Sequence, residues 1–214
     1  MYLTPTDMQA IEARVAALEK DLGIEVVTIV VGKSDVYPET VWKAFALGSA
    51  LTALAVTVCD LVRPDWVTSG LVLWSVVTIL GVGVLCALCS VYVPGIARLF
   101  LRTSRAELET SQYAKVQFLE RQLFATPQRT AILVLVSLLE RRVVILADVG
   151  LREHVTAAQW DGVVARMTEK LRVRATGAAV LAGLSAIGEL LAGKAIARGP
   201  ANLFADKPIE ESGA

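Results

Sequence analysis

Three acidic residues in the second half of the chain are the side chains best suited to binding a metal ion. Asp148 follows an apolar run and precedes Gly150, and Glu153 and Asp161 come soon after. Carboxylate oxygens are the preferred ligands of divalent cations such as Ca²⁺. The three residues therefore form a candidate metal site. Aspartate also favours turns in which its side chain binds the nearby backbone, so a loop-capping role for Asp148 is the competing interpretation, and the one we favour.

Other residues that could carry catalysis are few. His154 is the only histidine, which excludes a histidine-rich metal site. Cys86 and Cys89 lie one helical turn apart in a strongly apolar segment, and we expect them to pack as small apolar side chains. Glu189 interrupts an apolar helix face, where we favour a solvated or salt-bridged position. The sequence also lacks a glycine-rich phosphate loop, a Cys-x5-Arg loop and an Asp-x-Asp strand, so it shows no site for covalent phosphatase chemistry.

The composition indicates a membrane protein. Apolar residues make up 55% of the 214 residues, and the mean hydropathy is +0.57. This excess is concentrated between Trp42 and Ala97. The formal net charge is zero, so no global positive field recruits nucleic acid. We therefore expect an integral membrane protein that does not bind nucleic acid.

Two uncharged stretches could cross the lipid bilayer. Residues 44–59 carry no charge and reach an adequate length with their interfacial flanks, and residues 66–97 carry no charge at all. As one helix, the second stretch would measure roughly 48 Å against a hydrocarbon core of roughly 30 Å, so it must tilt or extend beyond the bilayer. Residues 63–65 can form only a tight turn, so residues 41–97 predict an antiparallel transmembrane hairpin.

The distribution of basic residues predicts the orientation of this hairpin. Basic residues gather at its two outer ends, whereas in the turn Arg63 is opposed by Asp65. The basic residues at the ends are Lys43, Arg98, Arg102 and Arg105. Positive charge favours the cytoplasmic side, so we expect both termini and the soluble domain in the cytoplasm, on the inner membrane.

Small residues in both predicted membrane helices would let the two backbones approach closely. They are Ala46, Gly48, Ser49, Ala50, Ala53, Ala55, Gly81 and Gly83. This pattern favours a packed hairpin and would also permit a homo-oligomer. Glycine and alanine are common in membrane helices, so it is about equally consistent with the sequence that these small residues have no specific packing role.

The residues before the hairpin predict one helix and one strand. Thr4 can cap a helix that begins at Pro5, and apolar residues recur at helical spacing until Gly23. Residues 24–31 are rich in β-branched side chains and predict a strand that is covered on both faces. Because a lone strand is not stable, its partners must come from beyond the hairpin.

The residues after the hairpin supply these partners. Residues 131–139 and 143–147 flank a charged turn and predict a β-hairpin, and the first run is too short for a third span. Residues 98–124 predict a charged helix that continues the second membrane helix. Its apolar residues fall near one face: Leu101, Leu108, Val116, Leu119 and Leu123. Residues 156–171 and 178–196 predict two further helices.

The sequence thus predicts an α/β fold, with a small β-sheet flanked by helices and an inserted two-helix transmembrane hairpin. Residues 1–40 supply the first helix and strand, residues 41–97 the hairpin, and residues 98–200 the remainder of the domain. The polar residues 201–214 predict a disordered tail. Such an insertion belongs in a surface connection.

Several stretches form an ordered set. They are residues 12–31, 129–137, 142–151, 155–160 and 183–191. This set resembles the TPM domain family, which includes thylakoid-lumen proteins implicated in photosystem II repair and related bacterial membrane proteins. The resemblance covers roughly two thirds of the chain and implies the same α/β fold. Some members of the family bind calcium or act as acid phosphatases, so the resemblance also implies a calcium site or phosphatase activity.

The chain departs from the family where acidic residues are expected. Many members carry Gly-Tyr-Gly-Leu-Glu followed by Leu-Thr-Asp-Ala. Here the corresponding stretches are Asp148-Val-Gly-Leu-Arg152 and Val155-Thr-Ala157-Ala158. Acids are thus replaced at Arg152 and Ala157, and calcium needs six to eight oxygen ligands. The departures weaken both inherited activities.

We therefore expect a membrane-anchored, non-enzymatic TPM-like domain. It would act as a binding, assembly or quality-control module for other membrane proteins. The alternatives are a divalent-cation-dependent phosphatase resembling the acid phosphatases of the family, or a calcium sensor. Either would use Asp148, Glu153 and Asp161 as metal ligands, and Ca²⁺ is the one cofactor that the resemblance suggests.

Overall fold

The computed structural model describes residues 2–62, 69–197, 199 and 203–213. The chain forms two compact units. We call Met1–Asp35 together with Ser104–Ala214 the sheet unit, and Val36–Thr103 the hairpin unit. The hairpin unit is thus inserted within the sheet unit. The predicted turn at residues 63–65 lies outside the described residues.

The sheet unit is built on four strands in the order β3-β2-β1-β4. Strand β1 (Glu25–Lys33) pairs in parallel with β2 (Ala131–Ser137), which pairs antiparallel with β3 (Arg142–Ala147). Strand β4 (Ile209–Gly213) pairs in parallel with the other edge of β1. This mixed sheet flanked by helices confirms the α/β fold and the predicted β2-β3 hairpin.

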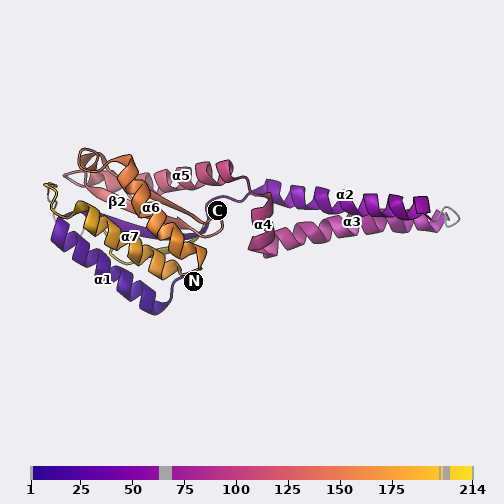
Figure 1. The fold of residues 1–214 in the computed structure, drawn as a ribbon, viewed down its shortest axis with the longest axis horizontal. Helices are drawn as coiled ribbons and strands as arrows, with labels where there is room; N and C mark the ends of the chain where they lie inside the picture. Colours follow the sequence, from indigo (N-terminus) through magenta and orange to yellow (C-terminus); the bar gives the residue numbers. More distant parts are fainter. Residues whose placement is uncertain (1, 63–68, 198, 200–202, 214) are drawn as a thin grey trace. The chain divides into compact units, whose positions relative to one another are not determined.

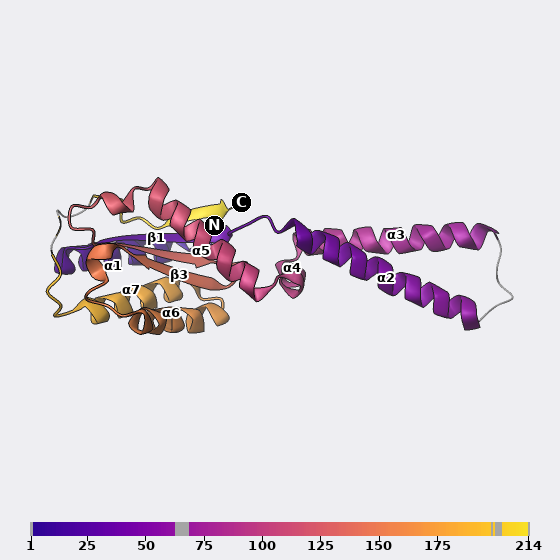
Figure 2. The ribbon, with the colours of Figure 1, turned by 90° about the horizontal axis from the view of Figure 1, so that it is seen from above.

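Helices cover both faces of the sheet (Figure 1, Figure 2). Helices α1 (Pro5–Leu22), α6 (Ala157–Arg172) and α7 (Thr176–Leu191) pack on one face. Helix α5 (Thr103–Glu120) lies on the other face, followed by the short 3-10 helix η2 (Leu123–Ala125). The ends of α1 are those predicted, because Thr4 caps its first turn and Gly23 adopts the left-handed conformation at φ 68° that favours glycine.

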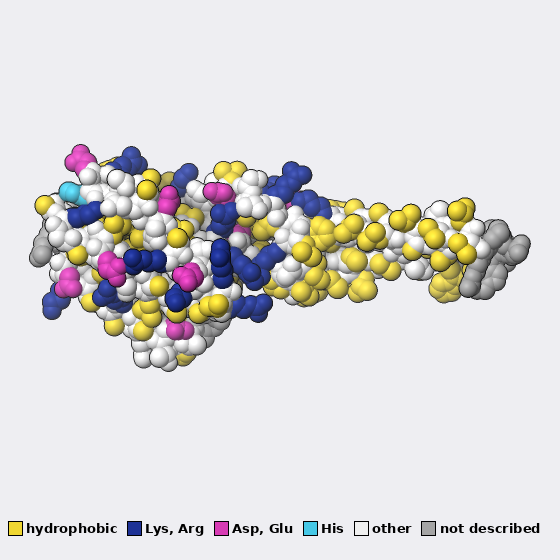
Figure 3. Space-filling model, in the orientation of Figure 1, with side chains coloured by type: hydrophobic (Ala, Val, Ile, Leu, Met, Phe, Trp, Pro, Cys, Tyr) yellow, Lys and Arg dark blue, Asp and Glu magenta, His cyan; other side chains and the backbone are white. Residues whose placement is uncertain are grey.

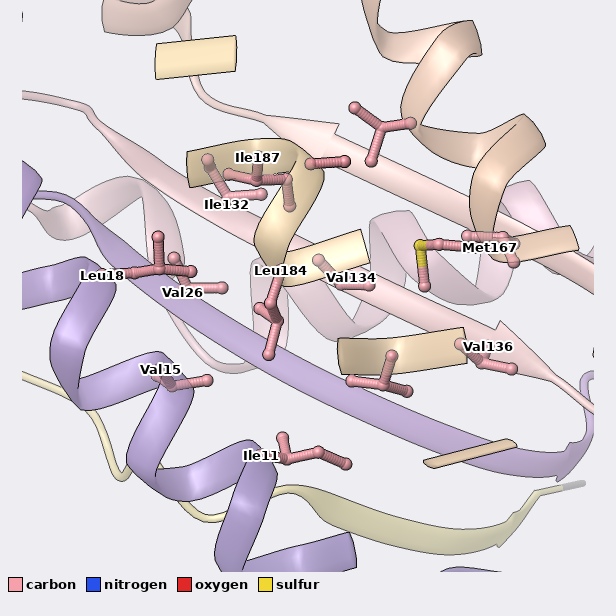
Figure 4. Close-up of a cluster of buried hydrophobic side chains, with 14 of the residues drawn as sticks. Ile11, Val15, Leu18, Val26, Ile132, Val134, Val136, Met167, Leu184 and Ile187 are labelled. Carbon is pink, nitrogen blue, oxygen red and sulfur yellow. The ribbon is translucent and has the colours of Figure 1, made fainter. Parts of the chain in front are cut away.

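Two hydrophobic cores follow from the alternation of side chains along the strands. Even-numbered residues of β1 and β2 face α1, α6 and α7, where Leu184 and Met167 are fully buried (Figure 4). Odd-numbered residues face α5 and form the second core. Its buried members are Val27, Ile29, Val31, Ala114, Leu123, Ala131, Leu133 and Leu135.

The C-terminal segment corrects one prediction. Residues 201–214 were expected to be disordered, but residues 203–213 are described and end in strand β4. Phe204 and Ile209 pack against the second core, and the backbone of β4 satisfies the open edge of β1. Apolar contacts and strand pairing therefore contribute to ordering a polar segment.

The segment after the hairpin unit corrects one more prediction. Helix α3 (Ser69–Tyr92) does not continue into the charged helix, because Pro94 lacks an N–H group and starts a separate helix, α4 (Pro94–Phe100). Helix α5 also turns its small and polar side chains to the sheet. They are Ala106, Thr110, Ala114 and Gln117, whereas Leu108, Val116 and Leu119 are 56%, 48% and 60% exposed.

The hairpin unit consists of α2 (Pro38–Val62), α3 and α4. Helices α2 and α3 are long and apolar enough to cross a membrane, and Figure 3 shows hydrophobic side chains covering them. They pack closely at Gly48, where an added Cβ would lie 2.7 Å from the sulfur of Cys86. An added Cβ at Gly83 would likewise clash with Ser49. Gly81 faces no atom within 4 Å, so only some of the small residues pack this pair.

Candidate carboxylate site

Four buried or half-buried carboxyl groups gather at one edge of the sheet, where β1 and β2 begin and β3 ends. The strand register places Glu25 opposite Ala131, and Ala147 opposite Ile132. Asp148 follows Ala147, Glu19 lies in the last turns of α1, and Asp206 precedes β4. We call Glu19, Glu25, Asp148 and Asp206 the carboxylate edge.

Asp148 is bound on both of its carboxylate oxygens. Arg129 donates from Nε to Oδ2 at 2.7 Å and from Nη2 to Oδ1 at 3.0 Å. The backbone N–H of Val149 donates to Oδ1 at 2.7 Å, so Asp148 caps the 3-10 helix η3 (Val149–Leu151). Asp148 is 5% exposed, and its hydrogen bonds to Arg129 raise the pKa of the guanidinium. The turn-capping role expected for Asp148 is confirmed, together with an ion pair.

The backbone holds Arg129 in this position. Its φ of 56° lies in the left-handed region, which costs free energy for a side chain other than glycine. The carbonyl of Arg129 accepts from the N–H of Gly150 at 2.9 Å, and an added Cβ at Gly150 would come within 2.4 Å of the Gln128 carbonyl oxygen. The turns before β2 and after β3 are therefore locked together.

The other predicted ligands do not join Asp148. Glu153 and Asp161 are exposed, the latter on α6. His154 is half-buried, and its carbonyl accepts from Lys194. Among the described residues, no three His, Cys, Asp or Glu side chains are placed to hold a metal ion together. Glu189 pairs with Arg166 at 2.7 Å on the exposed surface, as favoured for it.

The carboxyl group of Glu19 holds its proton more tightly than an ordinary glutamate does. Glu19 is 4% exposed, and its Oε1 accepts from the N–H of Val26 at 2.9 Å. Neither Oε2 of Glu19 nor Oδ1 of Asp206 receives a hydrogen bond from an N–H or hydroxyl group. Burial, followed by the nearby charges of Glu25 and Asp206, raises the pKa of Glu19 to about 8. The protonated carboxyl of Glu19 therefore donates to Asp206 at neutral pH.

Sequence reasoning missed this part of the site. Glu19 lies beside the apolar stripe of α1, and Glu25 interrupts an apolar run, so both positions carried a signal. Asp206 belongs to the segment that was expected to be disordered. Its partnership with Glu19 depends on the return of the chain to β1, which no local pattern predicts.

The carboxylate edge holds its charges in internal pairs. A cation at Asp148 would have to displace the Arg129 guanidinium, because that side chain already occupies both oxygens. The residues around Asp148 therefore do not fit a calcium ion in this arrangement, and calcium binding stays a prediction. What the edge can do chemically is hold and release a proton between Glu19 and Asp206.

Comparisons with known proteins agree with this architecture. Residues 96–190 match the model of the TPM domain. The NMR structure of the BA42 protein from the psychrophilic bacterium Bizionia argentinensis is similar in fold, with a TM-score of 0.57 and 12% identity over 98% of this chain and 96% of that one. A search of curated proteins finds no match. Helix α1 and strand β1 precede the matched residues and complete the same unit. The sheet unit therefore carries a match to the TPM domain over residues 96–190 and shares the fold of the BA42 protein.

Proposed function

We propose that this protein is a membrane-anchored binding and assembly or quality-control module for other membrane proteins. The observation that carries the proposal is the outward face of α5. Leu108, Val116 and Leu119 lie on this face and are about half exposed or more. Exposed apolar side chains gathered on one helix mark interaction surfaces.

The position of α5 along the chain supports a partner in the membrane. Helix α5 begins at Thr103, shortly after α4 ends at Phe100, so it is the first helix of the sheet unit that follows the hairpin unit along the chain. Lys43 and Arg98 lie at the same end of the hairpin unit, where Lys43 donates to the Phe100 carbonyl at 3.1 Å. Basic residues at that end favour a cytoplasmic location of the sheet unit.

Crosslinking in native membranes, followed by mass spectrometry, tests the proposed function. We expect the wild-type chain to capture membrane proteins, and the double variant Leu108→Ser/Leu119→Ser to lose most of them. The matched control is Val173→Ser, because Val173 is also apolar and 72% exposed but lies at the end of α6. Equal capture by all three chains, or capture of lipid alone, would contradict the proposal.

A reporter fused after Ala214 tests the proposed orientation. We expect the reporter to be active in the cytoplasm. Activity only outside the cytoplasm would refute the charge argument from Lys43 and Arg98.

A further inference from the structure

The C-terminal segment, residues 203–213, contacts the rest of the sheet unit in the manner of a bound peptide. Phe204 and Ile209 insert into the second core, and β4 pairs with β1 from Ile29 to Lys33. An added Cβ at Gly32 would come within 2.9 Å of the Ser212 carbonyl oxygen, so the strand seats tightly on β1. The segment thus uses two apolar anchors and a strand edge.

Two neighbouring glutamates fix this segment from opposite faces of the sheet. Glu210 Oε1 accepts from the backbone N–H groups of Tyr2 and Leu3, each at 2.6 Å. Glu211 Oε1 accepts from Arg121 Nη2 at 2.7 Å.

On the α5 side, Glu211 Oε2 accepts from the Tyr113 hydroxyl and from Gln117 Nε2, the latter at 3.4 Å. Arg121 Nε also donates to Gln117 Oε1 at 2.9 Å, so these two donors are held together. Burial and the bond to the Glu211 carboxylate raise the pKa of Tyr113. This set of donors is built to receive one carboxylate.

The pairing of β4 with β1 is shorter than the pairing of β2 with β1. Strand β4 meets β1 only from Ile29 onward, whereas β2 pairs with it from Glu25 to Val31. Before β4, the segment is held by the N–H of Leu203, which donates to Glu25 at 2.9 Å, and by the proton that Glu19 shares with Asp206. Loss of that proton would bring three carboxylates together and weaken the attachment.

We propose that the edge of β1, with Tyr113, Gln117 and Arg121, is a binding site for an extended acidic peptide. The chain's own residues 203–213 occupy it within the molecule, and an extended segment of a partner membrane protein replaces them by strand exchange. This inference rests on the proposed function. An open strand edge pairs readily with another extended chain, with backbone bonds giving affinity and side-chain contacts giving specificity.

The bound segment defines the chemistry of the partner. It supplies an aromatic or aliphatic anchor at the positions of Phe204 and Ile209 and two consecutive carboxylates after the second anchor. The carboxylate at the Glu211 position meets the Arg121 guanidinium, a charge-assisted bond. A basic residue there would face Arg121 and be rejected.

Peptide exchange on the full chain tests the proposal. A protease site replaces residues 195–197, and the chain is cut in detergent micelles and mixed with excess fluorescent peptide of residues 203–214. We expect the wild-type peptide to bind, and the Glu211→Arg peptide to bind at least tenfold more weakly. In the Arg121→Glu chain this preference reverses, whereas in the control Arg166→Glu chain it does not, because Arg166 lies on α6 and pairs with Glu189.

Three results would overturn the proposal. The first is equal binding of the wild-type and Glu211→Arg peptides. The second is a cut chain that keeps its own fragment against a thousandfold excess of free peptide. The third is that, in native membranes, only second copies of this chain occupy the edge of β1. Failure of this peptide site can be distinguished from failure of the proposed function. Capture of membrane proteins that depends on Leu119 but persists in the Arg121→Glu chain would retain the binding module and remove this site.

Discussion

Replacing Glu19 by glutamine tests the shared proton at the carboxylate edge. Glutamine keeps an oxygen that accepts from the N–H of Val26 and gains an amide N–H that can donate to Asp206. It imitates the protonated glutamate and cannot ionise. The variant therefore keeps the hydrogen bonds of the folded state and removes the part of the pH dependence of stability that comes from residue 19.

The expected magnitude follows from the pKa of Glu19, which rises from an ordinary 4.5 to about 8 on folding. Between these values the folded state holds a proton that the unfolded state has released, so stability falls as pH rises, by about 1.4 kcal/mol per pH unit. The contribution is fully present below pH 4.5 and lost above pH 8. Over the whole interval it reaches an upper limit of about 5 kcal/mol, which local relaxation reduces.

The assay is urea unfolding of the full chain in micelles between pH 5 and pH 8.5. Unfolding is monitored by hydrogen exchange of peptides from β1 and β2. At pH 8.5, we expect the free energy of unfolding of Glu19→Gln to exceed that of the wild type by at least about 2 kcal/mol. This difference should shrink as pH falls. Glu12→Gln, on the exposed face of the same helix, serves as the control. Parallel pH profiles for Glu19→Gln and wild type would refute the reasoning.

Three further changes test the rest of the structure. Leu184→Ala removes a fully buried side chain from the first core and should lower the free energy of urea unfolding by about 2–5 kcal/mol. Gly48→Val should reduce the monodisperse fraction in size-exclusion chromatography, since its Cβ would lie 2.7 Å from the Cys86 sulfur, whereas Gly81→Val should not. Calcium titration by calorimetry should give no heat of binding. The rate of phosphate release from a generic ester should be the same with and without added divalent metal ions. Metal-dependent turnover that Asp148→Ala abolishes would instead support the phosphatase alternative.

The parts of the fold that sequence reasoning predicted are those with local signals. Thr4 and Gly23 mark the ends of α1, and the charged turn between two β-branched runs marks the β2-β3 hairpin. The break at Pro94 also had a local signal, because proline lacks the N–H that a continuous helix needs, but hydropathy alone hides it.

The parts that could not be predicted depend on contacts between distant segments. On α5, Gln117 and Tyr113 donate to Glu211 of β4, whereas Leu108 and Leu119 point outward. The position of Asp148 in a turn was predictable, whereas its pairing with Arg129 was not, because the two residues are 19 positions apart and meet only when β2 and β3 pair.

Site-specific photocrosslinking in native membranes tests whether the outward face of α5 binds other membrane proteins. A photoreactive residue is placed at Leu119 on the outward face of α5, and in a second chain at Ala16 on the exposed face of α1. We expect adducts with other membrane proteins from position 119 and none from position 16. Adducts with lipid alone, or the same proteins captured from both positions, would contradict it.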